Sequence, residues 1–355
     1  MAHTSVAVAM SGGVDSTACA LLLQEHYQVC AYLMDIGQPG FAEQHQRVQQ
    51  LTEKIGIELQ VIDLKEQFNK RVLDSFVHSY GSGRTPNPCM LCNREIKLGL
   101  FMDQVLAKGA RYFATGHYAR CETIDGEPAL LKGFDPDKDQ SYFLARLSTR
   151  QLSSVLFPLG RMLKQNTYRL VEEHGFTGFR GLESQDICFL HDTSVSDFLA
   201  GRLDIEAGPS AEGPIVSVDG EELGRHRGLY RYTIGQRRGL GLPDQAPWYV
   251  TGLDPAHNRL IVGRDHDLYS RNLCAFSANW LVPPPPQGTR VQARIRSTHR
   301  GSKARLVRQE CDRFELEFDS DQRAITPGQY VVLYQNDRVI GSGEIGTPFR
   351  ESDSP

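Results

Sequence analysis

The 355-residue sequence has no long hydrophobic run and no excess of positive charge. No apolar stretch approaches the ~20 residues that a helix needs to cross a bilayer, so we expect no membrane partner. The first residues enter an apolar pattern without the basic and apolar regions of a secretory leader. The net charge of −4 argues against general nucleic-acid binding but leaves room for a local basic surface. These absences predict a cytoplasmic protein whose eight cysteines are reduced by default.

Two familiar nucleotide-binding loops are missing as well. Residues 11–16 have the sequence S-G-G-V-D-S, and no lysine follows the glycines. This excludes the G-x-x-x-x-G-K-[ST] loop of γ-phosphate chemistry, and the spacing does not fit the dinucleotide pattern G-x-G-x-x-G. We therefore expect neither nicotinamide nor flavin. No second C-x-x-C accompanies Cys89 and Cys92, which disfavours a structural zinc.

The start of the chain instead predicts a strand, a glycine-rich loop and a helix. Residues 6–10 are apolar and partly β-branched, and residues 17–23 favour a helix. Two glycines let backbone N–H groups approach phosphate oxygens, and the N-terminus of the helix adds a positive end. Ser11 and Ser16 can donate hydroxyl hydrogen bonds, and Asp15 can hold a magnesium ion that bridges phosphates. The loop thus predicts a polyphosphate site.

The first part of the chain alternates strand and helix. Strands are predicted at residues 5–10, 29–36, 58–64 and 111–115, and helices at 16–26, 42–55, 65–79 and 92–108. Such alternation predicts an α/β fold with a doubly wound parallel sheet, in which ligands bind beyond the carboxyl ends of the strands. The glycine-rich loop, Met34 and Gly116 would all open onto that edge.

The later part of the chain no longer alternates strand and helix. Leucines spaced to face a core predict a helical extension from residue 148 to about 201, and short strand-like segments follow to the end. We expect an α/β domain over residues 1–203, a small central β-rich domain over 204–277 and a C-terminal β-barrel over 278–355. Four prolines at 283–286 form either a stiff spacer near the second boundary or a rigid surface loop.

The second strong feature is T-P-N-P-C-M-L-C-N-R-E-I-K at residues 85–97. The prolines stop any preceding helix, and a new helix is expected to begin near Cys89. Cys89 and Cys92 are three residues apart and would face the same side. A helix N-terminus with Arg94 and Lys97 nearby is expected to lower the pKa of a thiol there.

A third feature is G-L-E-S-Q-D-I-C-F-L at residues 181–190, where Cys188 alone suggests a buried structural cysteine. Together with other motifs, the sequence resembles the tRNA-specific 2-thiouridylase family, within the ATP pyrophosphatase (PP-loop) superfamily. The resemblance covers essentially the whole chain. The motifs that carry it are S-G-G-V-D-S, P-N-P-x-x-x-C-N, G-H-Y at 116–118, K-D-Q-S-Y-F-L at 138–144, S-Q-D-I-C-F and Y-T-I-G-Q-R at 232–237.

The resemblance implies an enzyme that uses ATP to adenylate the 2-oxygen of the wobble uridine in tRNA. A persulfide sulfur, supplied by a sulfur carrier or a cysteine desulfurase, then displaces AMP. By motif match, Cys92 would be the nucleophile and Cys188 the persulfide carrier, and the two would form a transient disulfide. The other implied positions are Ala9, Met10, Ser11, Gly12, Gly13, Val14, Asp15, Ser16, Met34 and Gly116 for ATP, Asp15 for Mg²⁺, Asn87, Pro88 and Cys89 for the target base, and Lys138, Asp139, Gln140, Arg296 and Ser297 for tRNA.

One departure from the family leaves the sulfur chemistry open. Many members have Asp where this chain has Cys89, so Cys89, Cys92 and Cys188 form a set of three thiols. Three cysteines can hold a [4Fe–4S] cluster with one iron open to sulfide. We favour the persulfide route and retain the cluster as its alternative. Two rival functions are another PP-loop adenylating ligase or amidotransferase, and a non-catalytic, nucleotide-dependent RNA-binding iron sensor.

Two further features have both a structural and a functional interpretation. His117 in G-H-Y is expected to orient its loop more than to act in catalysis. Arginines gather at residues 225–238 and 290–308, where they indicate either RNA-phosphate contacts or ordinary solvated strand faces.

Overall fold

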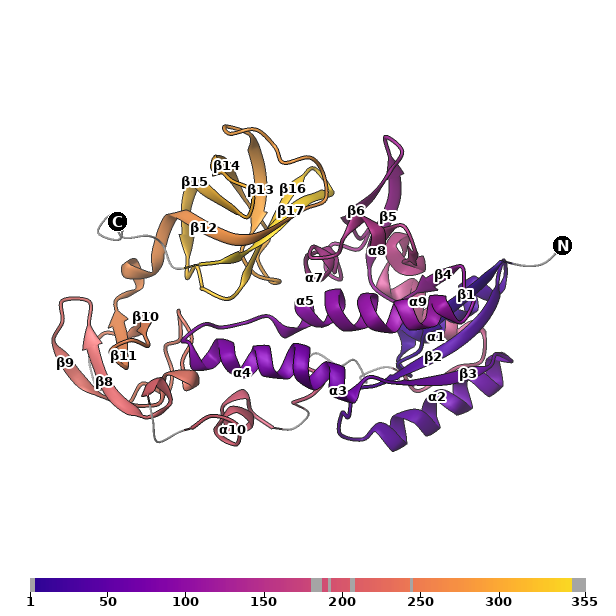
Figure 1. The fold of residues 1–355 in the computed structure, drawn as a ribbon, viewed down its shortest axis with the longest axis horizontal. Coiled ribbons are helices and arrows are strands. Elements are labelled where there is room, and N and C mark those ends of the chain that lie inside the picture. Colours follow the sequence, from indigo (N-terminus) through magenta and orange to yellow (C-terminus); the bar gives the residue numbers. More distant parts are fainter. Residues whose placement is uncertain (1–3, 180–186, 191–192, 205–207, 243–244, 347–355) are drawn as a thin grey trace. The chain divides into compact units, whose positions relative to one another are not determined.

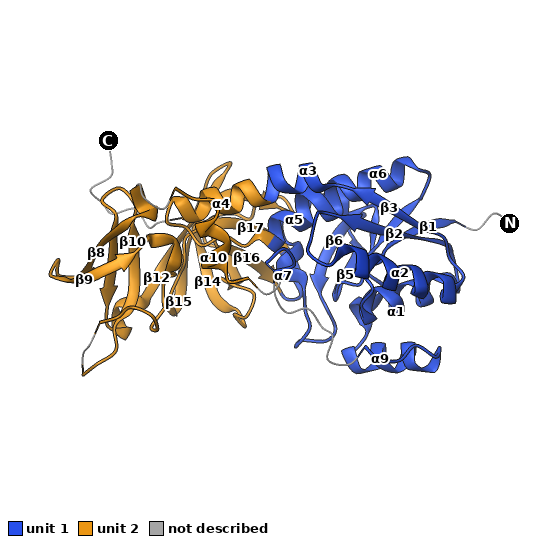
Figure 2. Ribbon diagram, turned by 90° about the horizontal axis from the view of Figure 1, so that it is seen from below, with its two compact units in different colours: residues 1–72, 89–191, 336–339 blue, residues 73–88, 192–335, 340–355 orange. Residues whose placement is uncertain are grey.

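A computed structural model describes residues 4–179, 187–190, 193–204, 208–242 and 245–346. The chain divides into two compact units (Figure 2). Unit 1 comprises residues 1–72, 89–191 and 336–339, and unit 2 comprises residues 73–88, 192–335 and 340–355. None of the helices in the described ranges has the length and apolarity that a bilayer span requires.

Unit 1 is built on a five-stranded sheet in the order β3-β2-β1-β4-β7. All of its pairings are parallel, which confirms the predicted doubly wound sheet. The central strand is buried on both faces, which explains its continuous apolar sequence. The bounds are β1 (Ser5–Ala9), β2 (Gln28–Asp35), β3 (Leu59–Asp63), β4 (Tyr112–Ala114) and β7 (Val155–Leu156).

Helices cover both faces of this sheet (Figure 2). Helices α1 (Val14–Gln24), α2 (Phe41–Ile55) and α9 (Lys164–Glu173) lie on one face, and α6 (Met102–Ala107) lies on the other. Val6, Val8 and Met10 of β1 and the loop after it form one core with buried residues of α1, α2 and α9. This core fixes where the loop between β1 and α1 leaves the sheet.

Two segments that were predicted as uninterrupted helices contain π-helical turns. The first runs through α3 (Lys65–Phe68), η1 (Asn69–Leu73) and α4 (Asp74–Gly81), and the second through α5 (Pro88–Cys92), η2 (Asn93–Phe101) and α6. Gly99 leaves helical geometry with φ −102° and ψ −109°. A Cβ there would lie 2.6 Å from the carbonyl oxygen of Arg94, so the kink depends on glycine.

The prediction missed a hairpin and did not resolve the helical region after it into its separate short helices. Strands β5 (Ala119–Ile124) and β6 (Glu127–Lys132) are joined by Asp125 and Gly126, both with positive φ. Asp-Gly is a known signal for such a turn. From residue 148 onward the helices are short and are interrupted by β7: α8 (Thr149–Leu152), η3 (Pro158–Arg161), α9 and α10 (Val195–Ala200), with α7 (Ser141–Leu144) just before them.

The helical extension expected from residue 148 is present as these short helices, which turns and β7 separate. Pro158 begins a short 3₁₀ turn, and a Cβ on Gly160 would lie 1.9 Å from the carbonyl oxygen of Ala119. Tertiary contact with the hairpin, which the leucine spacing cannot reveal, decides the conformation here.

Unit 2 contains two antiparallel-rich β structures (Figure 1). A four-stranded sheet has the order β10-β11-β8-β9, and a six-stranded barrel has the order β12-β15-β14-β13-β16-β17, closed by pairing of β12 with β17. The sheet comprises β8 (Glu212–Ser217), β9 (Glu222–Arg227), β10 (Tyr249–Asp254) and β11 (Arg259–Gly263), with short turns η4 (Gly208–Ser210), η5 (Leu229–Arg231) and η6 (Asp265–Leu268). The barrel comprises β12 (Tyr269–Trp280), β13 (Arg290–Arg294), β14 (Ser302–Gln309), β15 (Arg313–Arg323), β16 (Tyr330–Gln335) and β17 (Arg338–Ile345).

The barrel confirms the predicted C-terminal architecture. Its interior is apolar, with buried side chains from all six strands. The four prolines at 283–286 connect β12 to β13, so in this structure they lie in a loop between two barrel strands. The division into three domains at residues 203/204 and 277/278 stays a prediction.

Candidate active site

The glycine-rich loop lies between β1 and α1 and is held by its own side chains. Gly12 has φ +85°, a conformation that favours glycine. Ser16 Oγ donates to the carbonyl of Gly13 at 3.0 Å and accepts from the N–H of Ser11 at 3.2 Å. The Ser16 hydroxyl therefore braces the loop, whereas the sequence suggested that it would donate to phosphate.

Asp15, in the first turn of α1, is fixed by a buried cation that the sequence analysis missed. Lys164 Nζ lies 2.8 Å from each carboxylate oxygen of Asp15. The Tyr118 hydroxyl donates to Asp15 Oδ1 at 2.8 Å and lies 2.8 Å from Thr167 Oγ1. Lys164 is only 8% exposed. Because an unpaired ammonium is costly to bury, the Lys164–Asp15 pair sets the position of this carboxylate.

The remaining capacity of Asp15 suits a single metal contact. A carboxylate offers about four acceptor positions, and Lys164 and Tyr118 occupy three of them. The side chain of Asp15 is 34% exposed, so solvent and small ions can reach the carboxylate. Mg²⁺ is commonly held by one or two carboxylates, with phosphate oxygens and waters completing its shell. Asp15 thus fits the predicted magnesium ligand.

Gly116 lies against the same loop from the neighbouring strand. It follows β4, and a Cβ at this position would lie 2.9 Å from the carbonyl carbon of Asp15. Strands β1 and β4 are adjacent and parallel, so the glycine-rich loop and the segment after β4 leave the sheet next to each other at its carboxyl edge, where such folds bind ligands. Met34, half-buried near the end of β2, lies on the same edge. The predicted ATP residues therefore share one edge of the sheet.

Three of the eight free cysteines share one electrostatic neighbourhood in unit 1. Burial raises the pKa of the Cys92 thiol to about 12, and Lys97 opposes that shift through its charge and a backbone hydrogen bond. Burial raises the pKa of Cys89 too, and Lys97 again opposes it. Cys188 adds to the raised pKa of both other thiols, so it lies close to them despite its distance in sequence.

Two expectations about these thiols are wrong. The helix begins at Pro88, near Cys89 as expected, but the pKa of Cys92 is raised and not lowered, because burial outweighs the charge of Lys97. Cys188 is exposed, not a buried structural cysteine. Residues 181–186 of its motif lie outside the described residues.

The structure does not arrange these thiols as a metal cage. Within the described ranges, no group of three or more His, Cys, Asp or Glu side chains is placed to hold a metal ion. This finding concerns a site for a single metal ion, and the [4Fe–4S] alternative for Cys89, Cys92 and Cys188 stays a prediction.

His117 links the loop with the thiols. Its Nδ1 lies 2.7 Å from Thr115 Oγ1, and its ring packs edge-on against Phe157 at 6.0 Å. Burial, with the charge of Lys97, holds the pKa of His117 well below its usual value. The ring is therefore neutral at physiological pH. The charge of Lys97 also opposes the raised pKa of all three thiols, so His117 and the cysteines have this cation as a common electrostatic neighbour.

Comparison with known proteins assigns the whole chain. Residues 4–192 match a family described as the tRNA methyl transferase HUP domain, residues 197–264 its PRC-barrel domain, and residues 270–345 an aminomethyltransferase beta-barrel domain. The tRNA-specific 2-thiouridylase MnmA of Desulfotalea psychrophila is 46% identical over 95% of this chain and 98% of its own length. The chain belongs to the tRNA-specific 2-thiouridylase family.

Other members of the 2-thiouridylase family match over similar lengths. Proteins of the same name from Syntrophotalea carbinolica and Shouchella clausii are 42% and 39% identical, over 96% and 98% of this chain and 98% of each relative. A solved tRNA methyltransferase subunit from Methanocaldococcus jannaschii is 17% identical over 48% of this chain and 75% of its own, with a TM-score of 0.32. That last likeness is too low to support an argument.

Two of the residues that the 2-thiouridylase resemblance assigns to tRNA make hydrogen bonds within the protein. The Asp139 carboxylate accepts from the N–H groups of Gly133 and Ser141, both at 3.0 Å. Gln140 Oε1 accepts from the N–H of Tyr118 at 2.9 Å. These side chains hold the turn that carries Tyr118, while the neighbouring Lys138 is half-buried.

In unit 2, the arginine-rich segments contain both cations that form ion pairs or hydrogen bonds and exposed cations that form no ion pair among the described residues. Arg305 and Arg290 form ion pairs with Glu317 at 2.6 Å and Asp319 at 3.3 Å, as expected of an ordinary solvated strand face. Arg296 donates to the carbonyl of Arg323 at 3.2 Å, and the Ser297 carbonyl accepts from Arg294. Several exposed cations have no ion pair among the described residues: Arg227, Arg237, Arg238, Arg300 and Lys303.

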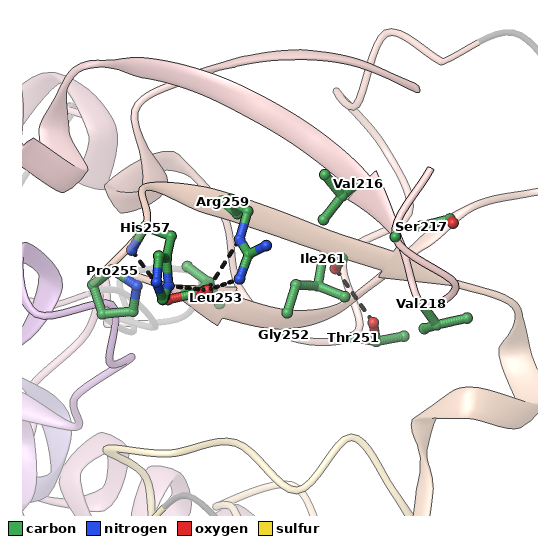
Figure 3. A pocket seen from close by; sticks show the side chains of 12 residues that line it. Val216, Ser217, Val218, Thr251, Gly252, Leu253, Pro255, His257, Arg259 and Ile261 are labelled. Atoms are coloured by element: carbon green, nitrogen blue, oxygen red, sulfur yellow. Dashed lines mark hydrogen bonds and ion pairs between the residues drawn. The ribbon is translucent and has the colours of Figure 1, made fainter. Parts of the chain in front are cut away.

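A separate cavity of about 650 Å³ lies in unit 2 against β8, β10 and β11 (Figure 3). Its main charged group is Asp254, which pairs with Arg259 at 2.7 Å and His257 at 2.9 Å. Asn87 and Pro88, assigned to the target base, also belong to unit 2 but do not line this cavity, nor does any other predicted site residue. Because the Asp254 carboxylate is already paired with Arg259 and His257, we assign no function to this cavity.

Proposed function

We propose that this chain catalyses the ATP-dependent 2-thiolation of the wobble uridine of tRNA. The observation that supports the proposal is that unit 1 holds both the glycine-rich loop with Asp15 and three thiols that have Lys97 as a common charged neighbour. Asp15 contacts the Gly116 loop, and Lys97 acts on His117 and on Cys92. The names of the relatives support the same reaction.

The first step is adenylation of the uridine. The backbone N–H groups of the loop and the N-terminus of α1 would hold the phosphates of ATP. The uridine 2-oxygen attacks the α-phosphorus, pyrophosphate leaves, and the oxygen becomes part of a good leaving group. Mg²⁺ held at Asp15 would neutralise charge on the phosphates. The Lys164 ammonium keeps that carboxylate in place throughout.

The second step transfers sulfur. Exposed Cys188 is accessible to a persulfide donor, either a sulfur carrier or a cysteine desulfurase. The terminal sulfur of the Cys188 persulfide attacks C2 of the base, and AMP leaves. The Cys92 thiolate then attacks the Cys188 sulfur, which releases 2-thiouridine and forms a Cys92–Cys188 disulfide. A two-electron thiol reductant reopens the disulfide before the next cycle.

The raised pKa of Cys92 has a consequence for this order of events. A thiol with a pKa of about 12 is protonated at rest, so the resolving nucleophile stays inactive until a base takes its proton. Lys97 is the cation placed to stabilise the thiolate once it forms.

Alternative functions explain less of the site. A PP-loop ligase that passes nitrogen has no need of coupled thiols, and an iron sensor would need a metal cage that the described residues do not form. The family descriptions name methyl transfer, yet an adenylating loop serves no purpose in it. Among tRNA contacts, we propose Lys138, Asn87, Pro88, Arg296 and Ser297. Reduced thiols and a tRNA substrate also favour a cytoplasmic location.

The test combines purified protein, ATP, Mg²⁺, a persulfide donor and unmodified tRNA, and detects thiolated tRNA by its retardation in a mercury-containing gel. Cys92→Ser and Asp15→Ala should each abolish the retarded band. Cys311→Ser is the matched control, because this thiol is exposed and lies in unit 2, and it should keep full activity. Full thiolation by the Cys92→Ser protein would contradict the proposal.

A further inference from the structure

We infer that Arg47 of α2 binds the pyrophosphoryl part of ATP, an inference that rests on the proposed function and deepens it. The edge of α2 lies directly against the glycine-rich loop. Gln44 Nε2 donates to the carbonyl of Ser11 at 2.9 Å. A Cβ built on Gly12 would lie 2.8 Å from Arg47 Nε and 3.4 Å from Arg47 Nη2. The guanidinium is therefore packed against the loop at Gly12.

Arg47 lacks the anionic partner that several other arginines of unit 1 have. Arg71, Arg120 and Arg150 each pair with a carboxylate at 3.2 Å or less. Arg47 is exposed, and within the described residues it has neither an ion pair nor a hydrogen bond. A guanidinium presents a planar fork of donors that matches a phosphate group. An arginine held at a phosphate loop without a protein anion is suited to a phosphate of the ligand.

The space beside the guanidinium is open. Arg47 lines a cavity of about 240 Å³ together with residues of α2 and the segment after α9. Lys54 lines it too, but its ammonium bonds the carbonyl of Gly175 and lies 4.3 Å over the ring of Phe176. All residues of this lining belong to the described part of the chain. Of its two cations, Arg47 is the one that remains available to an anion.

The charge of the ligand indicates which phosphates Arg47 contacts. When the bond between the α- and β-phosphates breaks, negative charge accumulates on the departing pyrophosphate. A guanidinium at the loop would stabilise that charge as well as bind the nucleotide. AMP lacks the pyrophosphoryl group, so its binding should not depend on Arg47.

Isothermal titration calorimetry of the full chain with ATP, inorganic pyrophosphate and AMP, each with Mg²⁺, tests the inference. Arg47→Met should weaken binding of ATP and pyrophosphate at least about tenfold, because a charge-assisted hydrogen bond is lost. Arg47→Lys should recover part of that affinity through its charge. Arg169→Met is the matched control, since Arg169 is exposed on α9 and has no ion pair among the described residues.

The outcomes separate this inference from the proposed function. Equal pyrophosphate affinity of the wild type and the Arg47→Met protein would overturn the role of Arg47 alone. An equal loss of AMP binding would overturn the assignment to the pyrophosphoryl group. A wild type that binds ATP and pyrophosphate with the expected dependence on Arg47, yet yields no thiolated tRNA, would uphold the inference and refute the proposed function.

Discussion

Replacement of Lys164 by methionine should destabilise unit 1 and loosen the nucleotide loop. Methionine keeps the length and the apolar stem of the side chain but removes the ammonium that lies 2.8 Å from both oxygens of Asp15. The carboxylate would then keep only the hydrogen bond from Tyr118. A partly buried charge without its counter-charge is the main cause of the expected loss.

The magnitude follows from the exposure of the two partners. Breaking a fully buried ion pair costs about 3–5 kcal/mol. The Lys164 side chain is 10% exposed, but that of Asp15 is 34% exposed, so water can solvate the abandoned carboxylate. We therefore expect Lys164→Met to lower the free energy of unfolding by about 2 kcal/mol, which corresponds to roughly a 30-fold change in the unfolding equilibrium.

Urea unfolding of the nucleotide-free protein measures this loss, and a double-mutant cycle assigns it. Asp15→Asn combined with Lys164→Met removes both charges, so the double variant should be more stable than the sum of the two single losses implies. Lys70→Met, at an exposed lysine, is the control and should change the unfolding free energy by less than about 0.5 kcal/mol. A coupling energy near zero would refute the claim that the pair holds the loop.

Two further predictions concern the thiols and the surface of unit 2. Because burial raises the pKa of Cys92 from 9.0 to about 12, its alkylation by iodoacetamide should keep accelerating with pH beyond 9, and Lys97→Met should slow it at every pH; a rate plateau near pH 8 would contradict this. The same raised pKa stabilises the fold below pH 9.0, and that contribution should be lost as the pH rises toward about 12 in a urea titration. Arg237→Gln combined with Arg238→Gln should weaken tRNA binding and flatten its dependence on salt, whereas Arg305→Gln, which removes a cation already paired with a glutamate, should change it little. Filter binding of tRNA at several salt concentrations measures both variants. An equal effect of the double change and of Arg305→Gln would refute the idea that only arginines without an ion pair contribute to tRNA binding.

Local sequence gave reliable predictions where the structure depends on neighbours in the chain. The β1–loop–α1 unit follows from an apolar run, two glycines and a helix-forming segment, all within residues 5–24. The alternation of strands and helices was enough for the parallel sheet, because right-handed crossovers leave few other topologies. The Asp125–Gly126 turn shows that a usable signal for the β5–β6 hairpin was present and was overlooked.

Errors arose where distant segments decide the conformation. The leucine spacing after residue 148 favours a helix, but Pro158 and the contact of Gly160 with Ala119 break it. The π-helical turns in η1 and η2 depend on hydrogen bonds five residues apart, which propensity does not resolve.

The sequence by itself determined the parallel, doubly wound type of the sheet, the edge on which the loop opens, and the residue types available for phosphate and sulfur chemistry. Only the tertiary structure brought Lys164 to Asp15, across 149 positions of the chain. It also reversed the expected pKa shift of Cys92, because burial depends on every segment that packs around the thiol. Hydrogen-bonding pattern and periodicity are local properties of a chain, whereas desolvation and charge pairing depend on how the whole unit folds.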